Sequence, residues 1–180
     1  MAILSAPIVF GLYAIAPEAI RLAGDGYEQA VPVLQALIFV LIPIFLDFPI
    51  GSLLNASGKQ ATKTAIMGGT MVINIILNAM LIPKVGILGA AYAALVSFVF
   101  MFGAGLFFIP AVIPGFSFVQ LLRSILPIYL VGVLMLIVVL ILKPVIGWLP
   151  VTFVGGVVYL GGLIVTKSFS WKDLRYLKQV

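Results

Sequence analysis

The 180-residue sequence contains no cysteine and no histidine, and it has only five acidic residues. The absence of cysteine excludes disulfide bonds and thiolate metal sites, and the absence of histidine excludes imidazole base catalysis and most zinc sites. The five carboxylates do not form the clustered sets with which metal-dependent lipid transferases hold Mg²⁺. The composition therefore argues against an enzyme, and it implies no cofactor and no bound metal.

Charge of either sign is also scarce, since only 8% of the residues are charged while 64% are hydrophobic. A soluble domain of this size leaves too much of its chain exposed to bury so much apolar surface in one core. Five stretches with at most one charge reach the length of about 20 residues that a helix needs to cross a bilayer, and a shorter sixth begins at Met1. The sequence therefore predicts an integral membrane protein.

The predicted fold class is all-α, a multi-pass transmembrane helix bundle that covers residues 1–166. Prolines and glycine at 110–117 interrupt the longest uncharged run and divide it between two helices. The six expected helices cover about residues 1–20, 31–55, 62–83, 86–109, 121–142 and 148–166. Residues 1–6 carry no basic residue, which argues against a cleaved signal peptide.

Residues 167–180 are expected to form a short amphipathic helix on the cytoplasmic surface. Ser170 and Asp173 have the spacing of a capping box, and Trp171, Leu174 and Leu177 recur every three residues. A frayed, solvated tail is the alternative.

The basic residues predict the orientation of the bundle. If both termini are cytoplasmic, seven of the ten Lys and Arg residues lie at inner connections and three at outer ones, as the positive-inside rule requires. The inner set is Lys59, Lys63, Arg123, Lys167, Lys172, Arg175 and Lys178, and the outer set is Arg21, Lys84 and Lys143. The expected location is the cytoplasmic membrane. The net charge of +5 is not a nucleic-acid footprint, because no basic stripe alternates with exposed aromatics.

Five sequence segments together resemble a known family. They are residues 22–30 (LAGDGYEQA) with 33–37 (VLQAL), residues 55–60 (NASGKQ), and residues 74–78 (NIILN) followed by 81–94 (LIPKVGILGAAYAA). In this order they resemble the C-terminal portion of the polysaccharide biosynthesis and O-antigen flippases, which belong to the multidrug/oligosaccharidyl-lipid/polysaccharide exporter superfamily. The last two segments taken together, 74–78 and 81–94, are the most specific, because their Asn, Pro and Gly residues have a fixed order and spacing. The resemblance covers residues 6–109 well, whereas the last two helices match only in position and hydrophobicity.

The resemblance implies a two-lobed transporter that turns lipid-linked oligosaccharide from the cytoplasmic to the outer leaflet. These six helices would then correspond to the C-terminal part of that transporter. The implied partners are membrane lipids, the lipid-linked oligosaccharide, and the missing N-terminal lobe or a subunit that replaces it. The chain is accordingly expected to be truncated or to assemble with a partner. The alternatives are a cation-coupled drug or metabolite exporter of the same superfamily and a non-transporting membrane assembly module.

Asp47 is the one acidic residue deep in a predicted span, where it lies between Pro43 and Pro49. An ionised carboxylate at the centre of a membrane helix costs about 2.5–3.5 kcal/mol on insertion scales, so such a residue faces water or a partner. One interpretation is a cation- or proton-coupling group or a contact to a sugar headgroup. The other is a structural bond to Asn55, to Ser52 or to a neighbouring helix.

Asn74 and Asn78 lie four residues apart and therefore share one face of their predicted helix. They either join helices through amide hydrogen bonds or line a hydrophilic cavity that meets sugar hydroxyls. Asn55 is a further cavity candidate of the same kind, and Gln35 and Ser97 are weaker ones.

The connections and glycines carry three further expectations. Lys59 and Lys63 should meet anionic headgroups beside a tight turn, and Pro83 should end one helix before Gly86 turns into the next. Three glycine pairs within spans should allow close helix packing, and they are Gly68-Gly69, Gly155-Gly156 and Gly161-Gly162.

Overall fold

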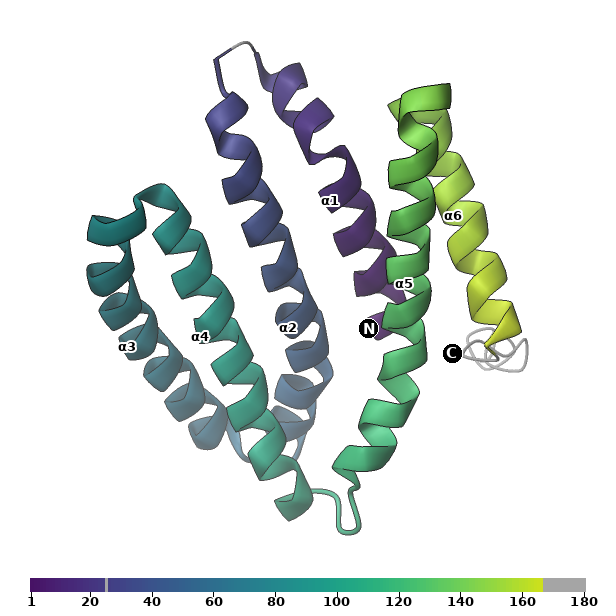
Figure 1. Ribbon diagram of the computed structural model, residues 1–180. Helices are drawn as coiled ribbons and strands as arrows, with labels where there is room; N and C mark the ends of the chain where they lie inside the picture. Colours follow the sequence, from purple (N-terminus) through teal and green to yellow (C-terminus); the bar gives the residue numbers. More distant parts are fainter. Residues whose placement is uncertain (25, 167–180) are drawn as a thin grey trace. The chain divides into compact units, whose positions relative to one another are not determined.

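The computed structural model describes residues 1–24 and 26–166, and over these residues the chain forms helices joined by short connections, with no strand (Figure 1). The helices are α1 (Ala2–Ala23), α2 (Val31–Ala56), α3 (Gln60–Val85), α4 (Ile87–Phe108), α5 (Phe118–Ile146) and α6 (Trp148–Val165), with short 3-10 helices η1 (Glu28–Ala30) and η2 (Ile109–Ala111). The all-α prediction is confirmed. The amphipathic tail expected at 167–180 lies outside the described residues.

All six α-helices are long and apolar enough to cross a membrane. The candidate spans run from 18 to 29 residues, at or above the minimum that the hydrocarbon core requires. Most of their surface is not covered by other parts of the chain, and the span of α3 is only 11% buried. Such apolar exposure is stable in lipid and not in water. The chain is therefore a multi-pass membrane protein.

The chain divides into two compact units. The first consists of Met1 and Ile15–Phe116, and the second of Ala2–Ala14 with the described residues from Ser117 onward. Helix α1 contributes its last part to the first unit and its first part to the second. In the first unit α4 packs extensively against both α2 and α3, whereas α2 and α3 contact each other much less (Figure 1). In the second unit α5 and α6 pack side by side.

The connection between α3 and α4 is a tight turn at Gly86. Gly86 has φ +64°, a backbone conformation that favours glycine, and its N–H donates to the Ile82 carbonyl at 2.9 Å. A Cβ atom on Gly89 would lie 2.6 Å from the backbone carbon and oxygen of Leu81. The expectation that Pro83 ends the helix is wrong, because α3 continues to Val85. Gly86 ends the helix instead.

The expectation of close packing is confirmed for one glycine in each of the two pairs of α6, but not for the Gly68-Gly69 pair of α3. In the second unit a Cβ on Gly155 would lie 2.7 Å from Val139, and one on Gly162 would lie 2.5 Å from Val131. Gly69 of α3 has ordinary contact distance to Phe100 of α4. The other members, Gly68, Gly156 and Gly161, have open space where a Cβ would point. A helix presents adjacent residues about 100° apart, so only one glycine of a pair can face a neighbouring helix.

Candidate functional site

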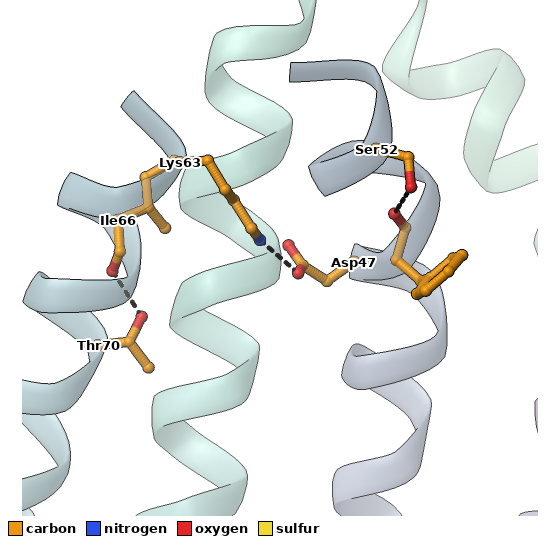
Figure 2. Close-up of polar contacts among 6 residues, drawn as sticks. Asp47, Ser52, Lys63, Ile66 and Thr70 are labelled. Carbon is orange, nitrogen blue, oxygen red and sulfur yellow. Dashed lines mark hydrogen bonds and ion pairs between the residues drawn. The ribbon is translucent and has the colours of Figure 1, made fainter. Parts of the chain in front are cut away.

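A buried ion pair joins α2 to α3 in the first unit. Lys63 Nζ lies 2.5 Å from Asp47 Oδ2, and the two side chains are only 12% and 8% exposed (Figure 2). Asp47 lies in the second half of α2, and Lys63 lies in the first turn of α3. Asp47 therefore makes the bond to a neighbouring helix that the structural interpretation of this residue expects. The other suggested partner, Ser52, donates to the Phe48 carbonyl of its own helix at 3.0 Å.

Lys63 points away from the end of its helix and into the bundle. At a rise of 1.5 Å per residue, Lys63 is about 5 Å from the start of α3, whereas Asp47 is about 14 Å from the end of α2. The side chains of Lys63 and Asp47 extend toward one another and meet between these two depths (Figure 2). Lysines near helix ends usually extend their ammonium group toward the membrane surface. The expectation that Lys63 meets headgroups is therefore wrong, because the carboxylate of Asp47 holds its ammonium group inside.

Two glycines make room for the ion pair. A Cβ on Gly51, one turn beyond Asp47 in α2, would lie 3.0 Å from Cε and 3.3 Å from Nζ of Lys63. A Cβ on Gly105 of α4 would lie 3.3 Å from Asp47 Oδ1 and 2.8 Å from the Ile50 side chain. Any larger residue at either position would push on the charged groups. All three helices of the first unit's hairpins therefore shape this site.

One carboxylate oxygen of the pair has no hydrogen-bond partner among the described residues. Asp47 Oδ1 is buried, and among the described residues none donates a hydrogen bond to it. Ile50, Leu54, Ile66 and Ile109 form a buried apolar cluster at the same end of the unit. An ionised oxygen that is buried without a donor loses its hydration and is costly. Asp47 Oδ1 is therefore the described polar atom of this site whose hydrogen bonding is least satisfied.

Asn74 and Asn78 form a second polar group, deeper in α3. Asn78 Nδ2 donates to Oδ1 and to the carbonyl of Asn74, and Asn74 Nδ2 donates to Ser97 Oγ of α4 at 3.3 Å. Ser97 in turn donates to the Ala93 carbonyl at 2.7 Å. This hydrogen-bonded row joins α3 to α4, and both asparagines remain half-buried. It lies about 16 Å along α3 from Lys63, so it is separate from the ion pair.

Asn55 is not part of either polar group. Asn55 is exposed in the last turn of α2, where its backbone carbonyl accepts a hydrogen bond from Gln60 Nε2 at 3.1 Å. Gln35 lies half-buried near the start of the same helix. Lys59, expected at the headgroups, donates to the Ala111 carbonyl at 3.3 Å. The structure thus brings together Asn74 with Asn78, pairs Asp47 with Lys63, and leaves Asn55 apart.

The second unit has a polar cluster of its own around the first turns of α1. Tyr129 OH of α5 lies 2.7 Å from Ser5 Oγ, and Tyr159 OH of α6 donates to the Ile3 carbonyl at 2.9 Å. Pro7 has no N–H to give to that carbonyl, which is four residues earlier in the helix. Tyr159 therefore supplies the hydrogen bond that the proline removes, which is a structural role.

Two surface hollows lie at the opposite end of the first unit from the ion pair. One has a volume of about 240 Å³ and is lined by Pro17, Ile20, Arg21, Gly24, Glu28 and Val31. The other has a volume of about 400 Å³ and is lined by residues of the α1–α2 connection and of the α3–α4 turn. Both include residues of the segments that the sequence singled out, but neither is lined by the cavity candidates Asp47, Asn55, Asn74 or Asn78. The ion pair therefore remains the candidate site.

Sequence reasoning missed Lys63, Gly51 and Gly105 as members of the site. A signal for two of them is present: Gly51 lies four residues after Asp47, and Lys63 is the first charge of the next span beyond the turn at Lys59. A helical hairpin brings such residues toward one another. Gly105 is one of several glycines of α4, and its contact with Asp47 depends on how the helices pack.

No family model, no curated protein and no solved structure matches this chain.

Proposed function

We propose that the chain is part of a membrane flippase that moves lipid-linked oligosaccharide across the cytoplasmic membrane during polysaccharide biosynthesis. The main support is the segment at residues 81–94, which resembles the O-antigen flippases in the order and spacing of its residues. In the structure this segment contains the Gly86 turn and the close approach of Gly89 to Leu81. The residues that carry the resemblance are thus those that determine the geometry of the α3–α4 hairpin.

The polar groups of the first unit suit such a substrate. Asn74 and Asn78 place amide groups, which both donate and accept hydrogen bonds, inside a span that is otherwise apolar. Sugar hydroxyls also donate and accept, so half-buried amides can replace part of their hydration during passage. The lipid tails would remain in the bilayer, which solvates the apolar faces of these helices. In this proposal the chain is a transport component and not an enzyme.

The proposed orientation places both termini in the cytoplasm, as the distribution of basic residues favours. The ion pair would then lie toward the cytoplasmic side of the first unit, and the α3–α4 turn would lie toward the outside. The proposed partners are membrane lipids, the lipid-linked oligosaccharide, and a further set of helices that completes the pathway. Repeat-built transporters bind substrate between their two halves, which makes such a second half necessary.

A deletion of the gene in its native host tests the proposal. Lipid-linked oligosaccharide should accumulate on the cytoplasmic leaflet, and surface polysaccharide should disappear and return with the wild-type gene. The variants Asn74→Ala and Asn78→Ala should restore surface polysaccharide less well than Ile75→Ala. Ile75 lies on the same helix and is 57% exposed, so this change is the matched control.

Two results would contradict the proposal. Normal surface polysaccharide in the deletion strain would remove the link to glycan transport. Increased sensitivity to toxic cations or drugs, with unchanged polysaccharide, would instead favour the cation-coupled exporter.

A further inference from the structure

The direction of the Lys63 side chain indicates that its position depends on the charge of Asp47. The Cα–Cβ bond of a helical residue tilts toward the N-terminus of the helix, which for Lys63 is the nearby end of α3. Its ammonium group nevertheless extends in the opposite direction to reach Asp47 (Figure 2). Without the negative charge, the lysine would gain hydration by extending toward the membrane surface.

Oδ1 of Asp47 is the atom that can bind a proton. Oδ2 is occupied by Lys63, whereas Oδ1 is buried and accepts no hydrogen bond from any described residue. Protonation of the carboxyl group removes the cost of a buried, unsatisfied negative charge. A Na⁺ or K⁺ ion would need several oxygen ligands, and the described surroundings supply the carboxylate, a lysine and two glycines.

No other charged group of the surrounding helices can take over either role. Helix α2 contains no titratable residue besides Asp47, and α4 contains only Tyr92, near its opposite end. Helix α3 contains only Lys84 besides Lys63, also at the opposite end, and η2 contains none. Lys59 precedes α3 and donates to the Ala111 carbonyl. In these described helices, Asp47 and Lys63 therefore have no other charged partner than each other.

We propose that Asp47 is a proton-binding site whose occupancy releases Lys63. At high pH the carboxylate is ionised and the pair is closed, with no net charge. As the pH falls, one proton from water binds Asp47 Oδ1, the contact to Lys63 Nζ breaks, and the site becomes a neutral acid beside a free ammonium group. The site thereby gains one positive charge, and the link between α2 and α3 that the ion pair provides is lost. This inference does not depend on which substrate the chain moves.

Infrared spectroscopy can observe the protonation directly without altering the pair. The chain has only three aspartates, so the variant Asp25→Asn/Asp173→Asn with carboxyl-¹³C aspartate leaves Asp47 as the sole labelled carboxyl group. Acidification should produce a ¹³C-shifted band of a protonated carboxyl group in a dry environment while the helical signal stays constant. No such band before the protein unfolds would overturn the proposal. A carboxylate band that responds to Na⁺ at constant pH would overturn it as well, in favour of a metal cation.

Chemical labelling tests the release of Lys63. Purified protein in nanodiscs is treated with an amine-acylating reagent at one fixed pH, and each lysine is quantified by mass spectrometry. In Asp47→Asn, which mimics the protonated state, labelling of Lys63 should rise several-fold over the wild type, while labelling of exposed Lys84 stays the same. Unchanged protection of Lys63 in Asp47→Asn, or equal labelling of Lys63 and Lys84 in the wild type, would refute the release.

Discussion

Replacing the two members of the ion pair one at a time and together should give unequal and strongly non-additive effects on stability. Removing one partner of a buried pair typically costs about 3–5 kcal/mol, whereas replacing both with apolar residues of similar size is near neutral. The side chains of Lys63 and Asp47 are 12% and 8% exposed, so the values for buried pairs apply. The informative variants are Lys63→Met, Asp47→Leu and the double variant.

The structure predicts the order of the two single changes. Lys63→Met leaves Asp47 with both oxygens unpaired, because Oδ1 already lacks a donor, so this variant should lose about 3–5 kcal/mol. Asp47→Leu leaves a lysine whose Cα lies near the end of α3, and the ammonium group can reach the interface instead. Its cost should be only about 1–2 kcal/mol, at the level of a lost buried hydrogen bond.

Equilibrium unfolding in mixed micelles, followed by circular dichroism, provides the measurement. The double variant should lie within about 1 kcal/mol of the wild type, so that the single changes overestimate its loss by about 3 kcal/mol or more. The matched control for general apolar repacking is Gly103→Ala, because a Cβ at Gly103 has nothing within 4 Å. Additive losses, or a larger loss for Asp47→Leu than for Lys63→Met, would refute the reasoning.

Three further predictions concern other parts of the chain. Gly155→Ala should destabilise the second unit by about 1–3 kcal/mol, because its Cβ would lie 2.7 Å from Val139, whereas Gly156→Ala should be neutral or slightly stabilising. Thermal unfolding of the two variants measures this difference, and equal effects would contradict the prediction. Tyr159→Phe should cost about 1–3 kcal/mol because it leaves the Ile3 carbonyl without a donor, and an unchanged melting curve would show that bond to be dispensable. A cysteine that replaces Tyr27, which is 60% exposed, should react with an impermeant thiol reagent from outside intact cells, whereas a cysteine that replaces Ser57 should react only after permeabilisation. The reverse labelling pattern would show that the orientation is inverted.

The helices could be predicted because charge and breakers separate them so clearly. The run from Val85 to Leu122 carries no charge, yet Pro110 and the residues after it mark the break between α4 and α5. Turn residues were harder, because proline is tolerated in membrane helices when neighbouring groups satisfy the freed carbonyl. For this reason α3 passes through Pro83.

The candidate site was only half predictable. Asp47 is conspicuous because a carboxylate inside an apolar span is costly, and this argument needs no structure. Lys63 is inconspicuous, because a lysine beside a turn ordinarily serves the membrane surface, and only packing decides that its side chain points inward. The contribution of Gly105 depends on how closely α4 approaches Asp47, and the spacing of residues along the sequence does not predict that distance.

The hydrogen bond from Tyr159 to the Ile3 carbonyl also constrains the order of events during synthesis. The two residues are 156 positions apart, and the contact of Ser5 with Tyr129 spans 124. At ribosomal speeds of about 5–20 residues per second, the start of α1 waits about 8–30 s for its tyrosine partner on α6 to be made. During that interval the carbonyl that Pro7 leaves unpaired must rely on water at the membrane surface or on the insertion machinery. Helix α1 is made before the other described helices but is therefore among the last of them to be fixed in place, and the second unit closes only when α6 inserts.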